Sequence, residues 1–133
     1  MIALDTNILV RLLVQDDIHQ FAAARGLLEQ TFAAGETCFV SDPVICELVW
    51  VLRSRYRASR DEIHAALANL TGQAGFVFED REVLTHALST FKQNKAGFVD
   101  CLIGAKARAK QTVATYTFDQ VLSQQEGFIL LPA

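Results

Sequence analysis

Residues 37–52, TCFVSDPVICELVWVL, contain the two patterns that decide the fold. The first four, 37–40, form a short apolar run that is typical of a buried strand. Asp42 followed by Pro43 is a helix-start signal, with Asp42 expected as the N-cap and Pro43 as the first helical residue. Apolar residues then continue at helical spacing to Leu52. The stretch therefore predicts a strand that leads directly into a helix.

The same alternation of apolar runs and helical patterns recurs along the rest of the chain. Four more strands are predicted, at residues 2–4, 76–78, 112–116 and 128–131. Helices are predicted from Asp17 to Gly35, from a Ser59/Glu62 capping box to Gly72, after Asp80, and from about residue 98 to Lys110. Strands that alternate with helices favour βαβ units. The predicted fold class is therefore α/β, with a parallel sheet and helices on both faces.

Length and composition predict one soluble domain over residues 1–133. Hydrophobic residues make up 51% of the chain and charged residues 20%, which allows a real core and argues against disorder. No apolar stretch approaches the 18 residues that a membrane span needs, and the N-terminus lacks the basic leader of a signal peptide. Three cysteines, Cys38, Cys46 and Cys101, show no CxxC spacing. An odd number without that spacing suits a reducing compartment, so we expect a cytoplasmic protein.

Basic residues are concentrated in one short segment, although the chain as a whole is acidic. The net charge of −3 excludes a global basic field that would draw the protein onto nucleic acid. Arg53, Arg55, Arg57 and Arg60 nevertheless fall within eight residues that contain no acid. They are either a solvated helix end, where cations complement the helix dipole, or a patch that contacts phosphate groups.

Four acids occur where apolar neighbours predict burial or the edge of a cleft: Asp5, Glu47, Asp100 and Asp119. Asp5 ends the first strand and Asp119 follows the fourth, while Glu47 and Asp100 lie within apolar helical segments. Asp100 and Asp119 have an alternative role as helix caps, and Asp5 as a turn residue. Several carboxylates in one cleft repel one another unless protons or a cation intervene. Hard cations such as Mg²⁺ or Mn²⁺ bind such oxygens.

Four motifs, taken in order, resemble the PIN-domain ribonucleases and most of all the VapC-type toxins. They are LDTN at residues 4–7, DPVICE at 42–47, GFVDCLIGA at 97–105 and TFD at 117–119. The resemblance covers essentially the whole chain. It implies a three-layer α/β/α sandwich around a parallel sheet.

The resemblance also implies an activity, the Mg²⁺-dependent hydrolysis of single-stranded RNA by an endoribonuclease. Asp5 and Asp100 are expected as the principal metal ligands, with Mn²⁺ as a substitute ion. Glu47 would hold or deprotonate the attacking water, and Asp119 would complete the shell. Asp119 falls where family members vary most.

Supporting residues and partners follow from the same resemblance. Thr6, Asn7 and Thr117 would orient ligands or phosphate, although each also suits ordinary turn capping. An uncontrolled ribonuclease harms its host, so a VapB-like antitoxin protein is expected as partner, together with the RNA substrate. A homodimer is expected as well, and no membrane association.

Other classes that begin with an aspartate after the first strand fit less well. A haloacid-dehalogenase-like phosphatase needs a second aspartate two residues later, where this chain has Asn7. A receiver domain needs an acidic pair near its start, which is absent. A non-catalytic RNA-binding or scaffold module remains the alternative to an enzyme.

Overall fold

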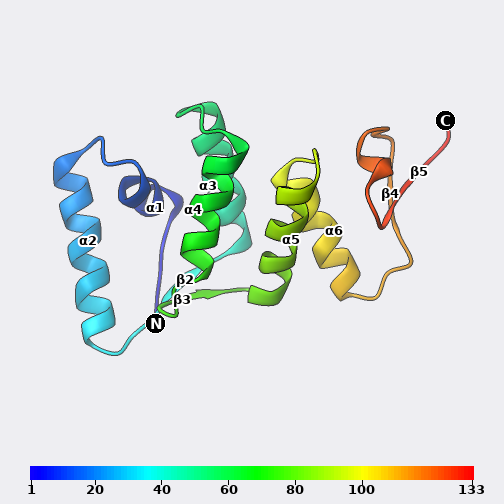
Figure 1. The fold of residues 1–133 in the computed structure, drawn as a ribbon. Helices are drawn as coiled ribbons and strands as arrows, with labels where there is room; N and C mark the ends of the chain where they lie inside the picture. The colour runs from blue at the N-terminus through cyan, green and yellow to red at the C-terminus, as the bar shows by residue number, and fades with distance from the viewer. The chain divides into compact units, whose positions relative to one another are not determined.

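The computed structural model describes all residues 1–133 and contains two compact units (Figure 1). We call Met1–Glu79 the N-terminal unit and Asp80–Ala133 the C-terminal unit. Strands and helices alternate along the chain, and every strand pairing is parallel. The predicted α/β class with parallel strands is therefore confirmed.

The N-terminal unit contains a three-stranded parallel sheet in the order β1-β2-β3. Its register aligns Ala3 with Phe39 and Phe39 with Val77, so the three strands end at the same edge. The elements are β1 (Ile2–Ala3), α1 (Thr6–Leu13), α2 (Ile18–Ala33), β2 (Cys38–Val40), α3 (Asp42–Ser54), α4 (Arg60–Thr71) and β3 (Phe76–Phe78).

Most helix boundaries of this unit agree with the sequence signals. Asp17 caps α2, and Ser59 and Glu62 form both hydrogen bonds of the predicted capping box on α4. The start of α3 differs by one residue, because Ser41 has the extended backbone of an N-cap and Asp42 is already helical. The backbone N–H of Asp42 donates to Glu79 Oε2 at 2.7 Å, so Asp42 is held as a first-turn residue.

The helix α1 is a feature that the sequence patterns did not predict. Its buried residues Thr6, Leu9 and Val10 recur at helical spacing. The helix begins directly after Asp5, which caps it, because β1 ends at Ala3. The first strand is thus shorter than predicted, and the apolar residues that follow it are helical.

The C-terminal unit contains two packed helices and a two-stranded parallel sheet (Figure 1). Phe91 and Phe98 join the helices through an edge-to-face contact with ring centroids 5.8 Å apart. The ring of Phe128 lies so close to Gly104 that a Cβ there would meet it at 2.8 Å. The elements are α5 (Arg81–Gln93), α6 (Phe98–Ala109), β4 (Thr115–Thr117), the 3-10 turn η1 (Leu122–Gln124) and β5 (Phe128–Leu130).

Strand β4 begins three residues later than predicted, because residues 110–112 close α6. Gln111 has a φ of 62°, and both the backbone N–H and the hydroxyl of Thr112 donate to the carbonyl of Ala107. These bonds satisfy a carbonyl at the helix end.

Apolar residues from nearly every element are buried. The fully buried large side chains are Leu9, Val40, Ile45, Leu48, Leu67 and Leu84. The three cysteines form no disulfide. None of the helices combines the length and the apolar character that crossing a bilayer requires.

Candidate active site

Acidic residues lie at the carboxyl edge of the three-stranded sheet. Asp5 follows β1 after Leu4, Asp42 follows β2 after Ser41, and Glu79 directly follows β3. Ligands of parallel sheets bind beyond this edge, because loops and helix N-termini meet there. Asp5 was predicted from the sequence to lie at this edge, and Glu79 was not. Its position directly after a short apolar run is the signal that would have found it.

Asp5 has a structural role that is compatible with a chemical one. Its side chain is exposed and its Oδ1 accepts the backbone N–H of Thr6 at 2.7 Å, which caps α1. Asp5 forms no ion pair, so its charge is not neutralised by a neighbouring cation. Of the two neighbours predicted to support it, Thr6 is buried and Asn7 is exposed. Of these two residues, Asn7 is therefore the one whose side chain is accessible to a ligand.

Glu47 lies in the second turn of α3 on its exposed face. Ile45, Leu48 and Val49 are buried on the opposite face, whereas Glu47 and Trp50 are exposed. The expectation that apolar neighbours bury Glu47 is therefore wrong for this carboxylate. It forms no ion pair and is accessible to a ligand.

Asp100 lies in the first turn of α6, inside the helix and not at its cap. Gly97 is the N-cap, and the Asp100 side chain is half-buried. A Cβ on Gly97 would lie 3.7 Å from Asp100 Oδ2, so the carboxylate turns back toward the helix start. The positive end of the helix dipole favours an anion there. The capping alternative for Asp100 is excluded, since glycine occupies that position.

Asp119 and Thr117 form a turn after β4. Asp119 Oδ1 accepts the backbone N–H of Leu122 at 3.0 Å, and Asp119 donates its own N–H to Thr117 Oγ1 at 3.0 Å. The turn role left open for Thr117 is thus present, and Asp119 accepts an N–H of η1 as the helix-cap alternative for it would require. The Asp119 side chain is nevertheless exposed.

The donor chemistry of these residues fits a hard divalent cation. Asp5, Glu47, Asp100 and Asp119 offer carboxylate oxygens without a basic partner. Within each unit taken by itself, no three carboxylate, imidazole or thiol side chains gather closely enough to hold a metal ion. Asp5 and Glu47 belong to the N-terminal unit, and the other two acids to the C-terminal unit.

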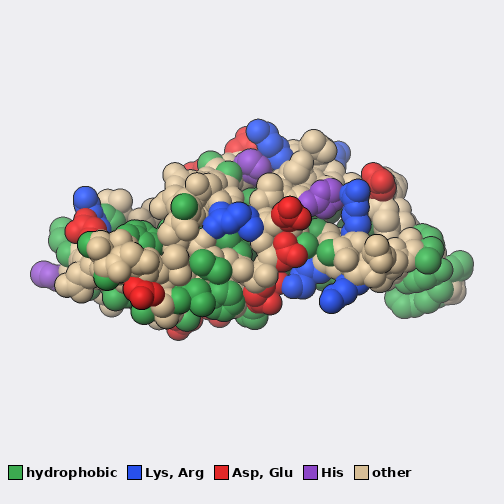
Figure 2. Space-filling view, turned by 90° about the horizontal axis from the view of Figure 1, so that it is seen from below, with side chains coloured by type: hydrophobic (Ala, Val, Ile, Leu, Met, Phe, Trp, Pro, Cys, Tyr) green, Lys and Arg blue, Asp and Glu red, His purple; other side chains and the backbone are tan.

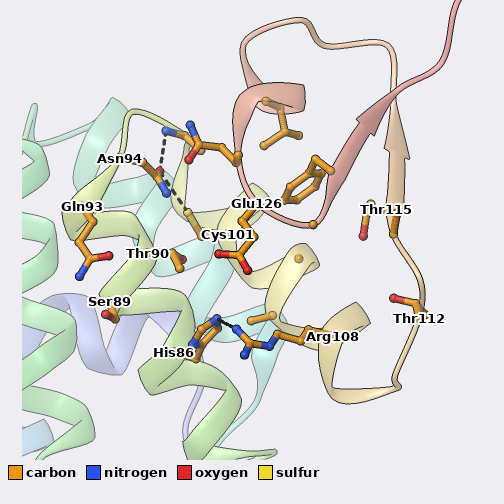
Figure 3. A pocket seen from close by; sticks show the side chains of 18 of the residues that line it. His86, Ser89, Thr90, Gln93, Asn94, Cys101, Arg108, Thr112, Thr115 and Glu126 are labelled. Atoms are coloured by element: carbon orange, nitrogen blue, oxygen red, sulfur yellow. Dashed lines mark hydrogen bonds between the residues drawn. The ribbon is translucent and has the colours of Figure 1, made fainter.

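The C-terminal unit also contains a pocket of about 610 Å³ that the sequence did not suggest (Figure 3). His86 Nε2 and Arg108 Nη1 lie 3.2 Å apart on one side of the pocket. On another side, Asn94 accepts a hydrogen bond from Cys101 Sγ; both interactions are drawn as dashed lines in Figure 3. Neither Asp100 nor Asp119 lines this pocket. Within the C-terminal unit, the pocket is therefore separate from the two candidate acids.

Parallel strands and an acidic carboxyl edge define the class, an α/β protein with carboxylates placed for ligand chemistry. The chain belongs to the PIN domain family, whose model matches residues 2–127. This membership confirms the predicted sandwich around parallel strands.

Two known proteins illustrate the likeness. The VapC ribonuclease of Aquifex aeolicus (strain VF5) is 27% identical over 105 residues, which cover 79% of this chain and 77% of that protein. The crystal structure of Mycobacterium tuberculosis VapC20, a sarcin-ricin loop cleaving toxin, is 21% identical with a TM-score of 0.43. That match covers 93% of this chain and 94% of VapC20.

Proposed function

We propose that this protein is a VapC-type endoribonuclease that hydrolyses phosphodiester bonds in single-stranded RNA and acts as the toxin of a toxin–antitoxin pair in the cytoplasm. Membership of the PIN domain family over residues 2–127 carries the proposal. The likeness to a VapC ribonuclease over 79% of the chain supports it. The family model extends across both units, which supports one functional domain over residues 1–133.

The proposed catalytic residues are Asp5, Glu47, Asp100 and Asp119, with Asp5 and Asp100 as metal ligands for Mg²⁺ or Mn²⁺. A bound ion would supply Lewis-acid chemistry that polarises a phosphoryl oxygen and activates water. Glu47 is exposed and unpaired, so it is able to hold the attacking water or accept its proton. Asp119 is already engaged in a turn, and its proposed role is to complete the ligand shell.

The neighbours of these acids have supporting roles in the proposal. Asn7 directly follows Thr6 and is exposed, so its side-chain amide is available to a phosphate oxygen. Thr6 is buried and Thr117 accepts the N–H of Asp119, so both act by positioning the acid beside them.

The proposed partners are a VapB-like antitoxin protein and a second copy of this chain. An exposed carboxylate such as Asp5 or Glu47 suits a basic side chain of the antitoxin, and Arg binds carboxylates in a bidentate manner. Co-expression with the product of an adjacent gene should yield a complex and relieve toxicity. Toxicity that persists despite complex formation would contradict the proposed inhibition.

Cleavage of a single-stranded RNA oligonucleotide by the purified protein tests the enzymatic proposal directly. Products are expected from single-stranded RNA with Mg²⁺, and none from Asp5→Asn protein prepared in parallel. Binding of the same RNA without cleavage would favour the non-catalytic module.

A further inference from the structure

One face of α3 carries an exposed tryptophan between an acid and an arginine. Glu47, Trp50 and Arg53 follow at intervals of three residues and are all exposed, whereas Ile45 and Leu48 lie buried on the other side of the helix. Trp50 is 67% exposed. Tryptophan is highly buried on average, because its indole has the largest apolar surface of any side chain. Exposure to this extent therefore indicates a contact surface.

The arginines that follow Trp50 have no acidic partners. Arg53, Arg55 and Arg57 are exposed and form no ion pair, whereas Arg11 and Arg25 are paired with Asp16 and Glu29. Arg53 lies in the last turn of α3, Arg55 caps the helix, and Arg57 lies in the turn that leads to α4. This concentrates unneutralised positive charge at one end of α3.

The turn that carries these arginines is held in a defined conformation. The Tyr56 hydroxyl donates to Asp16 Oδ2 at 3.1 Å, and the backbone N–H of Ala58 donates to the carbonyl of Leu52 at 2.9 Å. Arg57 adopts a φ of 53°, which is uncommon for a residue with a side chain. Because Tyr56 is anchored, the backbone positions of Arg55 and Arg57 on either side of it are held in place.

We propose that Trp50, Arg53, Arg55 and Arg57 form a binding surface for single-stranded RNA, with a base stacked on the indole and phosphates on the guanidinium groups. We call this set the Trp50 surface. Aromatic stacking combined with basic side chains is the general means of holding single strands without base pairing. Glu47 lies one helical turn from Trp50, so RNA on this surface passes beside a proposed catalytic carboxylate. This inference rests on the proposed function, since it concerns the same substrate.

Charge favours RNA over another protein as the occupant. Two copies of the chain that met through this surface would bring unpaired arginines toward each other, which is unfavourable. The protein as a whole has a net charge of −3, and the face in Figure 2 shows acidic side chains interspersed with basic ones. A polyanion is therefore attracted by a local cluster and not by the molecule as a whole.

Trp50 is the only tryptophan of the chain, so its fluorescence reports on this surface alone. The wild-type protein is titrated with a single-stranded RNA oligonucleotide in excess EDTA, which prevents metal-dependent cleavage. Saturable quenching is expected. In parallel, anisotropy of the labelled oligonucleotide is expected to show Trp50→Ala binding at least about fivefold more weakly, since stacking contributes about 1–3 kcal/mol per base. Trp50→Phe keeps an aromatic face and should retain most of the affinity.

The arginines are tested through the salt dependence of binding. Each of Arg53→Gln, Arg55→Gln and Arg57→Gln is expected to reduce the slope of log K against log salt by about 0.7. Arg25→Gln is the matched control, because Arg25 is also exposed but is ion-paired on α2, and its slope should equal that of the wild type. Circular dichroism spectra and melting temperatures confirm that every variant is folded.

Three results would overturn the inference. The first is RNA binding that leaves Trp50 emission unchanged. The second is a Trp50→Ala protein that binds the RNA with the same affinity as the wild type. The third is a pair of observations made without RNA: Trp50 emission changes with protein concentration, and the wild type has the mass of a dimer whereas Trp50→Ala has the mass of a monomer. This pair would assign the surface to a second copy of the chain. Quenching by RNA in EDTA without any cleavage in Mg²⁺ would leave this inference standing and contradict the proposed function alone.

Discussion

Asp5 Oδ1 accepts the backbone N–H of Thr6 at 2.7 Å, so the acid at the carboxyl edge of the sheet, two residues beyond β1, also caps the first helix. A cap needs only an oxygen in the right place, whereas a metal ligand also needs negative charge. The two roles of this side chain can therefore be separated by substitution.

Asp5→Asn retains a capping oxygen and removes the charge. Stability should stay close to that of the wild type, because asparagine caps helices as well as aspartate does. RNA cleavage should fall by about a hundredfold or more. Asp5→Ala should lose activity equally and also lower the free energy of unfolding by about 1 kcal/mol. Urea unfolding measures the stability of each variant, and a cleavage assay on the same preparations measures its activity. Unchanged activity in Asp5→Asn would show that Asp5 is not part of the site.

Glu47→Gln separates a structural role from a chemical one on α3. Because Glu47 is exposed and forms no ion pair, the melting temperature should change little. Cleavage should fall by about a hundredfold or more if this carboxylate positions water or accepts its proton. Glu29→Gln on α2 serves as the control for loss of an exposed glutamate. Cleavage at the parental rate would show that Glu47 has no part in the reaction.

The capping box of α4 makes a prediction about pH. Hydrogen bonds from the backbone and hydroxyl of Ser59 lower the pKa of Glu62 below 4.5, its ordinary value. A lowered pKa in the folded state adds stability at neutral pH, and this contribution is lost as the pH falls from about 4.5 through the folded-state value. Glu62→Gln should therefore reduce the acid sensitivity of unfolding.

The check for this prediction is urea unfolding between pH 7 and pH 3. Ser59→Ala should lower stability by about 1 kcal/mol at pH 7, since it removes the cap itself. If Glu62→Gln loses as much stability in acid as the wild type does, the hydrogen bonds from Ser59 do not stabilise the carboxylate.

Local signals in the sequence predicted most of the fold. The strand at Phe76–Phe78 and the capping box at Ser59 appear where the patterns placed them, because both depend on neighbouring residues. The helix α1 was missed because its apolar residues follow directly on a strand of only two residues, Ile2–Ala3. The end of such a short strand is set by the cap at Asp5, which is a local hydrogen bond and not a hydrophobic pattern.

The candidate site was less accessible to sequence reasoning. The apolar helical segment around Glu47 suggested burial, but the helix buries Ile45 and Leu48 and leaves Glu47 exposed. Which face of α3 is buried depends on packing against α1, which spacing along one helix does not reveal. Glu79 directly follows a short apolar run, which places it after a strand, but its position beside Asp42 arises from strand register and not from that run.

The measurement that tests the central claim most directly is cleavage of single-stranded RNA by purified protein as a function of divalent metal. The protein is treated with excess EDTA, assayed, and assayed again after Mg²⁺ or Mn²⁺ is restored, with Asp5→Asn purified identically to reveal contaminating nuclease. Cleavage should stop in EDTA, return with either ion and be absent from the variant at every step. Undiminished cleavage in excess EDTA, abolished by Asp5→Asn, would contradict the metal-dependent mechanism. Absence of cleavage under all conditions by folded, RNA-binding protein would contradict the assignment as a ribonuclease.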